Sequence, residues 1–253
     1  MTTPSGGRDR GAVLRLLITG FFDWRELGSP PDLHRLRDNP SGRLLFGEID
    51  PGGGPSPPAG GVLAALLDEA WQREVGVEAA FNVLPVAWGV AEGLAYDRHD
   101  VVIHMGLGVY DDDDILVVER GAYHRREGLD ARERPPADAA FALGVGIDEV
   151  IRAPSWLDDG LDMLNGSRCE GYRLEVKEAR FDNVFLCNET HGRALLSLGE
   201  GSGGGGLLAA YFIHLPYPRA GDERALADAV KTLIASLVGQ VHARACQPSS
   251  LKA

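Results

Sequence analysis

Three side chains in this sequence could share one hydrolytic reaction: Glu119, Cys187 and His214. A cysteine sulfur attacks a carbonyl carbon when an imidazole accepts its proton, and a carboxylate can hold that imidazole in orientation. These residue types point to acyl transfer by a thiol nucleophile.

Cys187 has the most informative local setting of the three cysteines. It lies in the segment VFLCNETHGRALL, where an apolar run meets a helix predicted over residues 189–198. A thiol at a helix N-terminus gains thiolate character because the local potential is positive. Cys169 and Cys246 have no such setting. The alternative interpretation of Cys187 is a buried structural cysteine, because free cysteine is common in protein cores.

His214 and Glu119 each lie near the end of an apolar run. His214 is in AAYFIHLPYP, just before Pro216, and Glu119 ends ILVVE. Taken singly, the histidine could be a satisfied core residue and the carboxylate could be simply solvated. If all three residues follow apolar strands, however, they could converge on one edge of one sheet, which favours a shared site.

Strand and helix signals alternate along the chain. Short apolar runs predict buried strands at residues 12–19, 79–86, 100–105, 115–118 and 207–215. Residues 172–178 alternate apolar and polar side chains and predict a strand with one face exposed to solvent. Helical spacing is present at residues 62–73, 189–198 and 222–242, and residues 87–98 could form a short helix. Residues 127–160 are poorly patterned and are expected to be largely loop. The alternation predicts an α/β fold with ligand loops at the carboxyl ends of the strands.

The composition narrows the class of partner. A net charge of −12 offers no basic patch for phosphates, so nucleic acid and an anionic membrane surface are not expected as partners. Three widely spaced cysteines suggest neither a disulfide framework nor a zinc site. Residues 1–10 lack the apolar core of a signal peptide and no apolar run reaches membrane-spanning length, so we expect a cytoplasmic protein.

The length of 253 residues suits one domain. We place it at residues 11–245, with flexible termini at residues 1–10 and 246–253. Residues 50–61 (DPGGGPSPPAGG) are rich in proline and glycine and are expected to form a mobile surface loop.

Short motifs occur in a distinctive order: ITGF, NPS, a strand-ending LP, VVIHMGLG, ERGA, LCN and FIHLPY. In this order the sequence resembles the pyroglutamyl peptidase I (pyrrolidone-carboxylate peptidase) family of cysteine peptidases, over roughly residues 14–242. The resemblance implies one three-layer α/β/α domain with a twisted, mostly parallel sheet, and a homo-oligomer. It also implies Glu119, Cys187 and His214 as the catalytic residues.

The implied reaction removes an N-terminal pyroglutamyl residue from a small peptide, without a metal ion or organic cofactor. Phe21, Trp24 and Phe185 would form apolar walls around the lactam ring, whose polar edge would meet main-chain groups near Leu107. An arginine of the family downstream of its glutamate has a possible counterpart in Arg132.

The sequence departs from the family where the substrate would bind. The glycine-rich AGGR segment is replaced by GVY and four aspartates, Asp111, Asp112, Asp113 and Asp114, and AGT before the nucleophile is replaced by DNV. The four aspartates could be a solvated loop or could border the pocket and favour basic residues after the scissile bond. Trp24 stands in the second aromatic place of the first motif.

These departures leave two alternatives to pyroglutamyl hydrolysis. The same three residues could act on a different lactam, a small amide or a biosynthetic intermediate. A catalytically silent binding protein on the same fold is the other alternative, and it is disfavoured because Glu119, Cys187 and His214 are all present.

Overall fold

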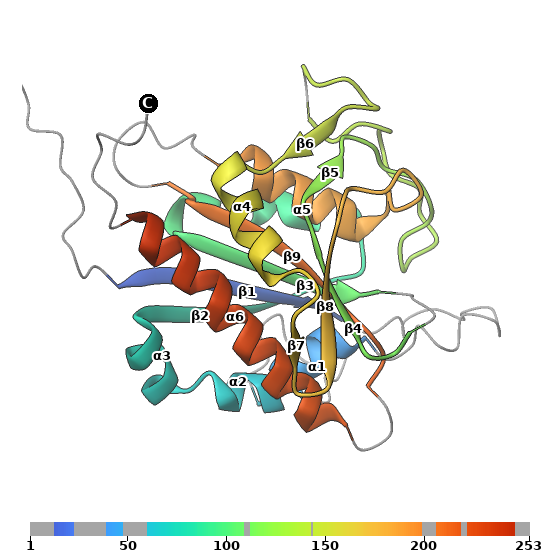
Figure 1. The fold of residues 1–253 in the computed structure, drawn as a ribbon. Helices are drawn as coiled ribbons and strands as arrows, with labels where there is room; N and C mark the ends of the chain where they lie inside the picture. Colours follow the sequence, from blue (N-terminus) through green and yellow to red (C-terminus); the bar gives the residue numbers. More distant parts are fainter. Residues whose placement is uncertain are drawn as a thin grey trace, which may run out of the picture.

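The central feature of the structure, a computed structural model, is a seven-stranded sheet with helices on both faces (Figure 1). The structure describes residues 13–22, 39–47, 60–108, 112–142, 144–198, 206–218 and 222–245. The strand order is β2-β1-β3-β9-β4-β8-β7. The strands are β1 (Leu14–Phe21), β2 (Val77–Leu84), β3 (Val101–Leu107), β4 (Ile115–Glu119), β7 (Arg168–Cys169), β8 (Tyr172–Lys177) and β9 (Ala209–Leu215).

Most neighbouring strands are parallel, as the sequence predicted. β2, β1, β3 and β9 pair in parallel, and so do β4 and β8. The pairs β4–β9 and β7–β8 are antiparallel. A separate two-stranded sheet is formed by β5 (Gly121–Tyr123) and β6 (Val150–Arg152). The fold is therefore a three-layer α/β/α arrangement around a mostly parallel sheet.

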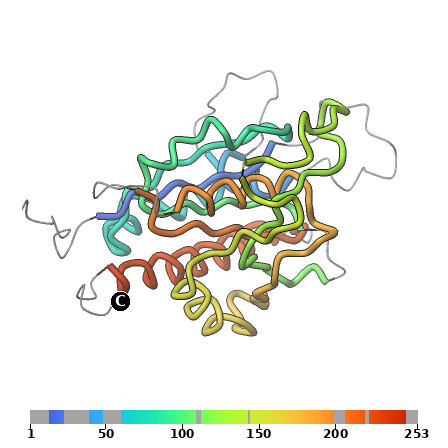
Figure 2. The backbone as a smooth tube through the Cα atoms, turned by 90° about the horizontal axis from the view of Figure 1, so that it is seen from above, coloured from blue at the N-terminus to red at the C-terminus, as the bar shows by residue number. Residues whose placement is uncertain are grey.

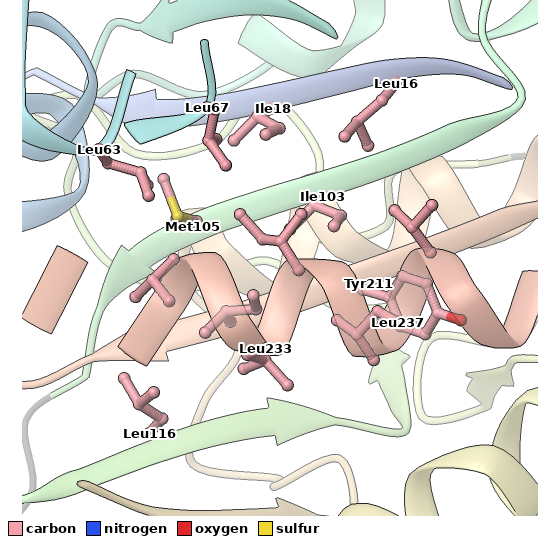
Figure 3. Close-up of a cluster of buried hydrophobic side chains, with 14 of the residues drawn as sticks. Leu16, Ile18, Leu63, Leu67, Ile103, Met105, Leu116, Tyr211, Leu233 and Leu237 are labelled. Carbon is pink, nitrogen blue, oxygen red and sulfur yellow. The ribbon is translucent and has the colours of Figure 1, made fainter. Parts of the chain in front are cut away.

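One face of the sheet carries the main hydrophobic core. It is covered by α1 (Pro40–Phe46), α2 (Val62–Leu66), α3 (Glu69–Val75), α4 (Ser155–Leu164) and the long α6 (Glu223–Ala245). Figure 3 shows side chains of this core, in which Ile103 and Met105 of β3 lie opposite Leu233 and Leu237 of α6. Each such fully buried side chain contributes about 1.5–3 kcal/mol of hydrophobic stabilisation. Seen from above, α6 runs along one side of the sheet (Figure 2).

The opposite face packs against α5 (Leu186–Leu196) and two 3-10 turns, Val90–Gly93 and Tyr96–Arg98. Alternate strand residues reach this side, because successive side chains of a strand point to opposite faces. Val102 and Ala210 pack with Ala194 and Leu195 of α5. By the same alternation, the α5 face also receives polar side chains of the sheet: Thr19, His104, Glu119 and His214.

Two predicted helices differ from the structure, and one predicted loop agrees with it. The helix expected over residues 62–73 is two helices, because the Asp68 carboxylate accepts the backbone N–H of Trp71 and starts α3 anew. Residues 127–160 are largely loop, as expected, apart from β6 and the first part of α4. The short helix expected within residues 87–98 is the pair of 3-10 turns.

Several expectations fall on residues outside the described ranges: the wall residue Trp24, Cys246, the termini at 1–10 and 246–253, and all but the last two residues of the 50–61 loop. Among the described residues, no helix is long and apolar enough to span a membrane.

Candidate active site

The thiol of Cys187 lies against the middle of the sheet. α5 begins at Leu186, so Cys187 is its second residue, as expected of a thiol at a helix start. A Cβ atom at Gly106 would lie only 2.8 Å from the Cys187 sulfur and 2.9 Å from the ring of Phe212. Gly106 pairs with His214 in the register of β3 and β9. The thiol therefore lies over a glycine whose neighbour on the next strand is the candidate base.

His214 and Glu119 are in direct contact. Nε2 of His214 lies 3.1 Å from Oε1 of Glu119, and each side chain is only 4% exposed. The same carboxylate oxygen accepts the amide N–H of Asn183 at 2.6 Å. A buried carboxylate with two polar neighbours is well suited to hold an imidazole in one orientation.

The way in which the three residues meet differs from the prediction of one shared strand edge. β4 runs antiparallel to β9, with Val117 opposite His214, so Glu119 reaches His214 as a diagonal neighbour across this pair. Cys187 follows a loop and begins a helix instead of ending a strand. Of the three residues, only His214 lies near the carboxyl end of one of the four parallel strands β2, β1, β3 and β9, as predicted.

Two opposing effects act on the ionisation of Glu119. Burial favours the neutral acid, but the charge of His214 and hydrogen bonds from His214 and Asn183 outweigh it. The pKa of Glu119 is therefore lowered from its ordinary value of 4.5, and the group is an anion at neutral pH.

The thiol of Cys187 does not have the thiolate character that was expected from its place at a helix start. Burial raises its pKa, and the negative charge of Glu119 raises it further. Together they outweigh a backbone hydrogen bond at Cys187 that favours the thiolate, because desolvation penalises the charged form. The thiol is therefore neutral at neutral pH.

Two more buried histidines lie close to this group, and the sequence reasoning did not select them. Nδ1 of His104 lies 2.7 Å from the Thr19 hydroxyl, and Nε2 lies 3.3 Å from the Tyr96 hydroxyl. His191 lies one helical turn after Cys187 and is 1% exposed. The i,i+4 spacing of Cys187 and His191 was the signal that could have identified His191.

An apolar cluster lies around Cys187. Its buried members include Phe21 and Phe212. Three partly buried side chains pack against them: Trp88, Phe185 and Cys187. The rings of Trp88 and Phe185 meet edge to face, with centroids 5.2 Å apart. The structure thus brings the predicted wall residues Phe21 and Phe185 into one cluster with the thiol and adds Trp88, which the sequence reasoning missed.

The predicted residue Leu107 ends β3 directly after Gly106 and is half-buried. It is therefore adjacent in the chain to the glycine that supports the thiol. Arg132 is exposed on a turn next to the apolar cluster, since its neighbour Ala131 is a buried member of that cluster, and its backbone N–H donates to the carboxylate of Asp130. This turn is tied to the loop after β2 because Ala131 N–H donates to the carbonyl of Val86.

A buried ion-pair network holds the loop after β5 onto α5. Nη1 of Arg126 donates to Oε1 of Glu189 at 3.1 Å, and Nε of Arg193 donates to the same oxygen at 2.8 Å. Glu189 lies two residues after Cys187 in α5. The Arg126 guanidinium also donates to the carbonyls of Asp138 and Ala140. The network therefore fixes the loop beside the helix that carries Cys187.

The acidic run after β3 faces another part of the sheet. Asp112 lies 3.6 Å from Arg173 of β8, and Asp114 lies 3.9 Å from Arg168 of β7. β8 and β7 are the last strands at one edge, whereas Cys187 contacts β3. Asp111 is outside the described residues.

The chemistry that this arrangement supports is transfer of an acyl group to sulfur. It combines a thiol at a helix start, an imidazole on the strand next to the glycine that lies under this thiol, and an ionised carboxylate in contact with the imidazole. In the described ranges, no group of three or more histidine, cysteine, aspartate or glutamate side chains is placed to hold a metal ion.

Comparison with known proteins gives structural matches only. No family model matches the sequence, and no curated protein matches it either. Pyroglutamyl peptidase I from Bacillus amyloliquefaciens matches with a TM-score of 0.57 at 15% identity, over 90% of this chain and 95% of that one. A mutant pyrrolidone carboxyl peptidase from Pyrococcus furiosus matches with a TM-score of 0.56 at 18% identity, over 90% of this chain and 100% of that one. The pyrrolidone carboxyl peptidase from Thermococcus litoralis matches with a TM-score of 0.54 at 19% identity, over 91% of this chain and 94% of that one. At these identities the likeness establishes the fold.

Proposed function

We propose that this protein is a thiol-dependent peptidase that removes an N-terminal pyroglutamyl residue from small peptides. The observation that carries the proposal is that the Cys187 thiol lies over Gly106, whose partner on the next strand is His214, and that His214 contacts Glu119 at 3.1 Å. The fold shared with solved pyroglutamyl peptidases supports the choice of substrate class.

The proposed reaction begins with proton transfer from Cys187 to His214. Because Nε2 of His214 faces Glu119, Nδ1 is the ring nitrogen that would take the proton. The sulfur attacks the pyroglutamyl carbonyl carbon and a tetrahedral oxyanion forms. The imidazolium then protonates the leaving amine, and the C–N bond breaks to leave a thioester. Water, deprotonated by His214, attacks the thioester, and free pyroglutamate and the thiol are released.

The start of α5 supplies the groups that would stabilise the oxyanion. The first backbone N–H groups of a helix have no intrahelical acceptor and carry partial positive charge. Phe185 occupies the N-cap position and makes no side-chain capping hydrogen bond. The amides of the first turn, which includes Cys187, are thus suited to a developing negative charge.

The apolar cluster around the thiol would enclose the lactam ring. Phe21, Phe185 and Trp88 are aromatic and lie in the cluster that contains Cys187. A five-membered lactam is small and largely apolar apart from one amide edge, which suits aromatic walls and a few main-chain partners near Leu107. Trp24 is proposed as a further wall residue.

A different lactam or small amide is the second candidate substrate. The specific observation in its favour is Trp88, whose indole N–H is buried and has no hydrogen-bond partner among the described residues. An unused donor next to the apolar cluster could bind an acceptor on the acyl group that pyroglutamate does not carry.

The test is an assay of purified protein with a pyroglutamyl arylamide beside other aminoacyl arylamides and small lactams. We expect preferential release of arylamine from the pyroglutamyl compound. Cys187→Ala should lower the rate of arylamine release by at least about 10³-fold. The matched control is Cys169→Ala, which should retain wild-type rates. Substantial activity in Cys187→Ala would overturn the assignment, and preference for another acyl group would favour the second candidate.

The cytoplasmic location and the homo-oligomeric state expected from the sequence stay predictions.

A further inference from the structure

The side-chain amide of Asn183 contacts the same oxygen of Glu119 that His214 contacts. Nδ2 of Asn183 donates to Oε1 of Glu119 at 2.6 Å, and Nε2 of His214 lies 3.1 Å from that oxygen. A carboxylate oxygen has lone pairs for two donors, and hydrogen bonds to an ionised acceptor are among the strong ones. One oxygen is therefore held from two directions, by β9 and by the loop that precedes α5.

The backbone on both sides of this amide is anchored. The N–H of Asn183 donates to the carbonyl of Arg180 at 3.0 Å, and the carbonyl of Val184 accepts the N–H of Glu127 at 2.9 Å. Val184 is buried, and α5 begins two residues after it. Asn183 lies four residues before Cys187. The segment that holds the carboxylate therefore leads directly into the helix start that holds the thiol.

The donor at position 183 is a neutral amide, and this suits the task of the carboxylate. Glu119 has a lowered pKa and is an anion at neutral pH, as it must be to stabilise an imidazolium on His214. A cation in place of Asn183 would neutralise this charge, and an anion would repel it. The adjacent carboxylate, that of Asp182, instead pairs with Nε of Arg180 at 2.9 Å. The amide thus holds the carboxylate and leaves its charge in place.

We propose that Asn183 is a positioning residue for the reaction: its amide fixes Oε1 of Glu119 where that oxygen contacts His214. The carboxylate then holds the imidazole, and the second ring nitrogen stays directed at the thiol. The role rests on the proposed function, because it concerns the same thiol, imidazole and carboxylate. Asn183 belongs to the DNV segment that replaces AGT, so it is one of the residues by which this chain departs from the family that it resembles.

The experiment has two readouts. The first is kcat and KM for a pyroglutamyl arylamide at pH 7.5. The second is the rate of alkylation of Cys187 by iodoacetamide, resolved by mass spectrometry with Cys169 as the internal reference. Alkylation reports on the thiol and its imidazole partner and needs no substrate.

The variants are Asn183→Ala, Asn183→Asp, Glu119→Gln and the exchange variant Asn183→Asp/Glu119→Gln. The matched control is Asn165→Ala, which removes an exposed asparagine that accepts the N–H of Val176 on β8. Melting temperature and circular dichroism show whether each variant is folded. If Asn183→Ala does not fold, the comparison of Asn183→Asp with the exchange variant decides, because these two differ only at position 119.

We expect Asn183→Ala to lower kcat about 10-fold and to leave KM within about twofold, because the amide contacts the carboxylate. Alkylation of Cys187 should slow at least about threefold, and Asn165→Ala should match wild type in both readouts. Asn183→Asp should be slower still, since two carboxylates would face each other. The exchange variant should be at least about fivefold faster than Asn183→Asp. Its new amide at position 119 can donate to the new carboxylate while its oxygen still accepts from His214.

Two results would overturn the role of Asn183. One is a wild-type kcat in Asn183→Ala. The other is an exchange variant no faster than Asn183→Asp, because the loss would then not pass through residue 119. Failure of the proposed function gives a different pattern, in which wild type leaves the pyroglutamyl arylamide and the other acyl substrates intact. In that case the alkylation rates test the role, and equal rates for Cys187 in wild type and Asn183→Ala would overturn it.

Discussion

The thiol of Cys187 occupies space that only glycine at position 106 leaves open. Its pKa is raised by burial and by Glu119, so the proposed reaction requires a neighbour that removes the proton as the sulfur attacks. That neighbour has to be placed closely, because a displacement of about 1 Å can cost 10²-fold in rate. Gly106 sets this placement, since it lies under the sulfur and beside His214.

Gly106→Ala should therefore impair activity without unfolding the protein. The new methyl group would meet the Cys187 sulfur at 2.8 Å and the Phe212 ring at 2.9 Å, so one of them must move. We expect kcat/KM to fall at least about 10-fold, with a stability loss of about 1–3 kcal/mol from overpacking. Gly239→Ala in α6 is the control, because no atom lies within 4 Å of its added Cβ. It should leave activity unchanged and stabilise by about 0.5–1 kcal/mol; equal activity in both variants would contradict the assignment of the thiol.

At the scale of elements, α5 connects the candidate site to the loop after β5. Its Cys187 end faces the sheet, and Glu189 binds Arg126, which is itself 8% exposed and holds the carbonyls of Asp138 and Ala140. Gly192 allows close packing here, since a Cβ atom would lie 2.4 Å from the ring of Phe141. The helix, the loop and β5 therefore behave as one packed unit.

Arg126→Met should destabilise this unit by about 3 kcal/mol or more, because it leaves the buried Glu189 carboxylate with less compensation. Chemical denaturation of the variant measures the loss. Adding Glu189→Leu should restore part of the stability, since an uncompensated buried charge costs more than an absent pair. The control is Arg224→Ala, which removes an exposed pair with Asp228 on α6 and should change stability by no more than about 0.5 kcal/mol. Similar losses in Arg126→Met and Arg224→Ala would contradict the buried network.

At the scale of the whole molecule, acidic pH acts against the fold through its buried histidines. Burial lowers the pKa of His104 to about 3, and the charge of His191 adds to this effect. Burial likewise lowers the pKa of His191 to about 4. An unfolded chain would bind protons at these sites near pH 6.5, while the folded chain does not. Stability is therefore full above pH 6.5 and falls as the pH drops toward these lower values.

We predict a fall in unfolding free energy between pH 6.5 and 4, to which His104 and His191 each contribute up to about 1.4 kcal/mol per pH unit. Denaturant titrations at several pH values measure the slope. His104→Gln should make the slope shallower, whatever its effect on stability at pH 7, because the residue no longer titrates. A slope as steep as that of wild type would show that His104 is not held neutral in the fold.

The acidic run gives a prediction about specificity. Asp112 and Asp114 pair with Arg173 and Arg168 at the β8–β7 edge, so their charge is partly neutralised there. Changing all four aspartates of the run to asparagine should leave the ratio of kcat/KM for pyroglutamyl peptides with Lys or Glu next essentially unchanged. If the substitutions change this ratio, and the change becomes smaller as the salt concentration rises, the run borders the pocket. The salt dependence identifies a charge effect, because exposed charges are screened over about 10 Å at 0.1 M ionic strength.

The sequence by itself determined most of the strands and the local setting of the nucleophile. Runs such as AVLRLLIT and DVVIHM form buried parallel strands because their apolar side chains suit a sheet that is covered on both faces. The helix beginning just before Cys187 was also predictable, although the structure starts it three residues earlier than residue 189. These features depend on residues close together in the chain.

Only the tertiary structure decided how the site is assembled. The reversed direction of β4 depends on its pairing with β9, which is about a hundred residues away and leaves no periodic signal. The same pairing brings Glu119 to His214 as a diagonal neighbour. The raised pKa of Cys187 and the lowered pKa of His191 depend on burial between α5 and the sheet. Desolvation is a property of the packed layers, and neither residue type nor spacing expresses it.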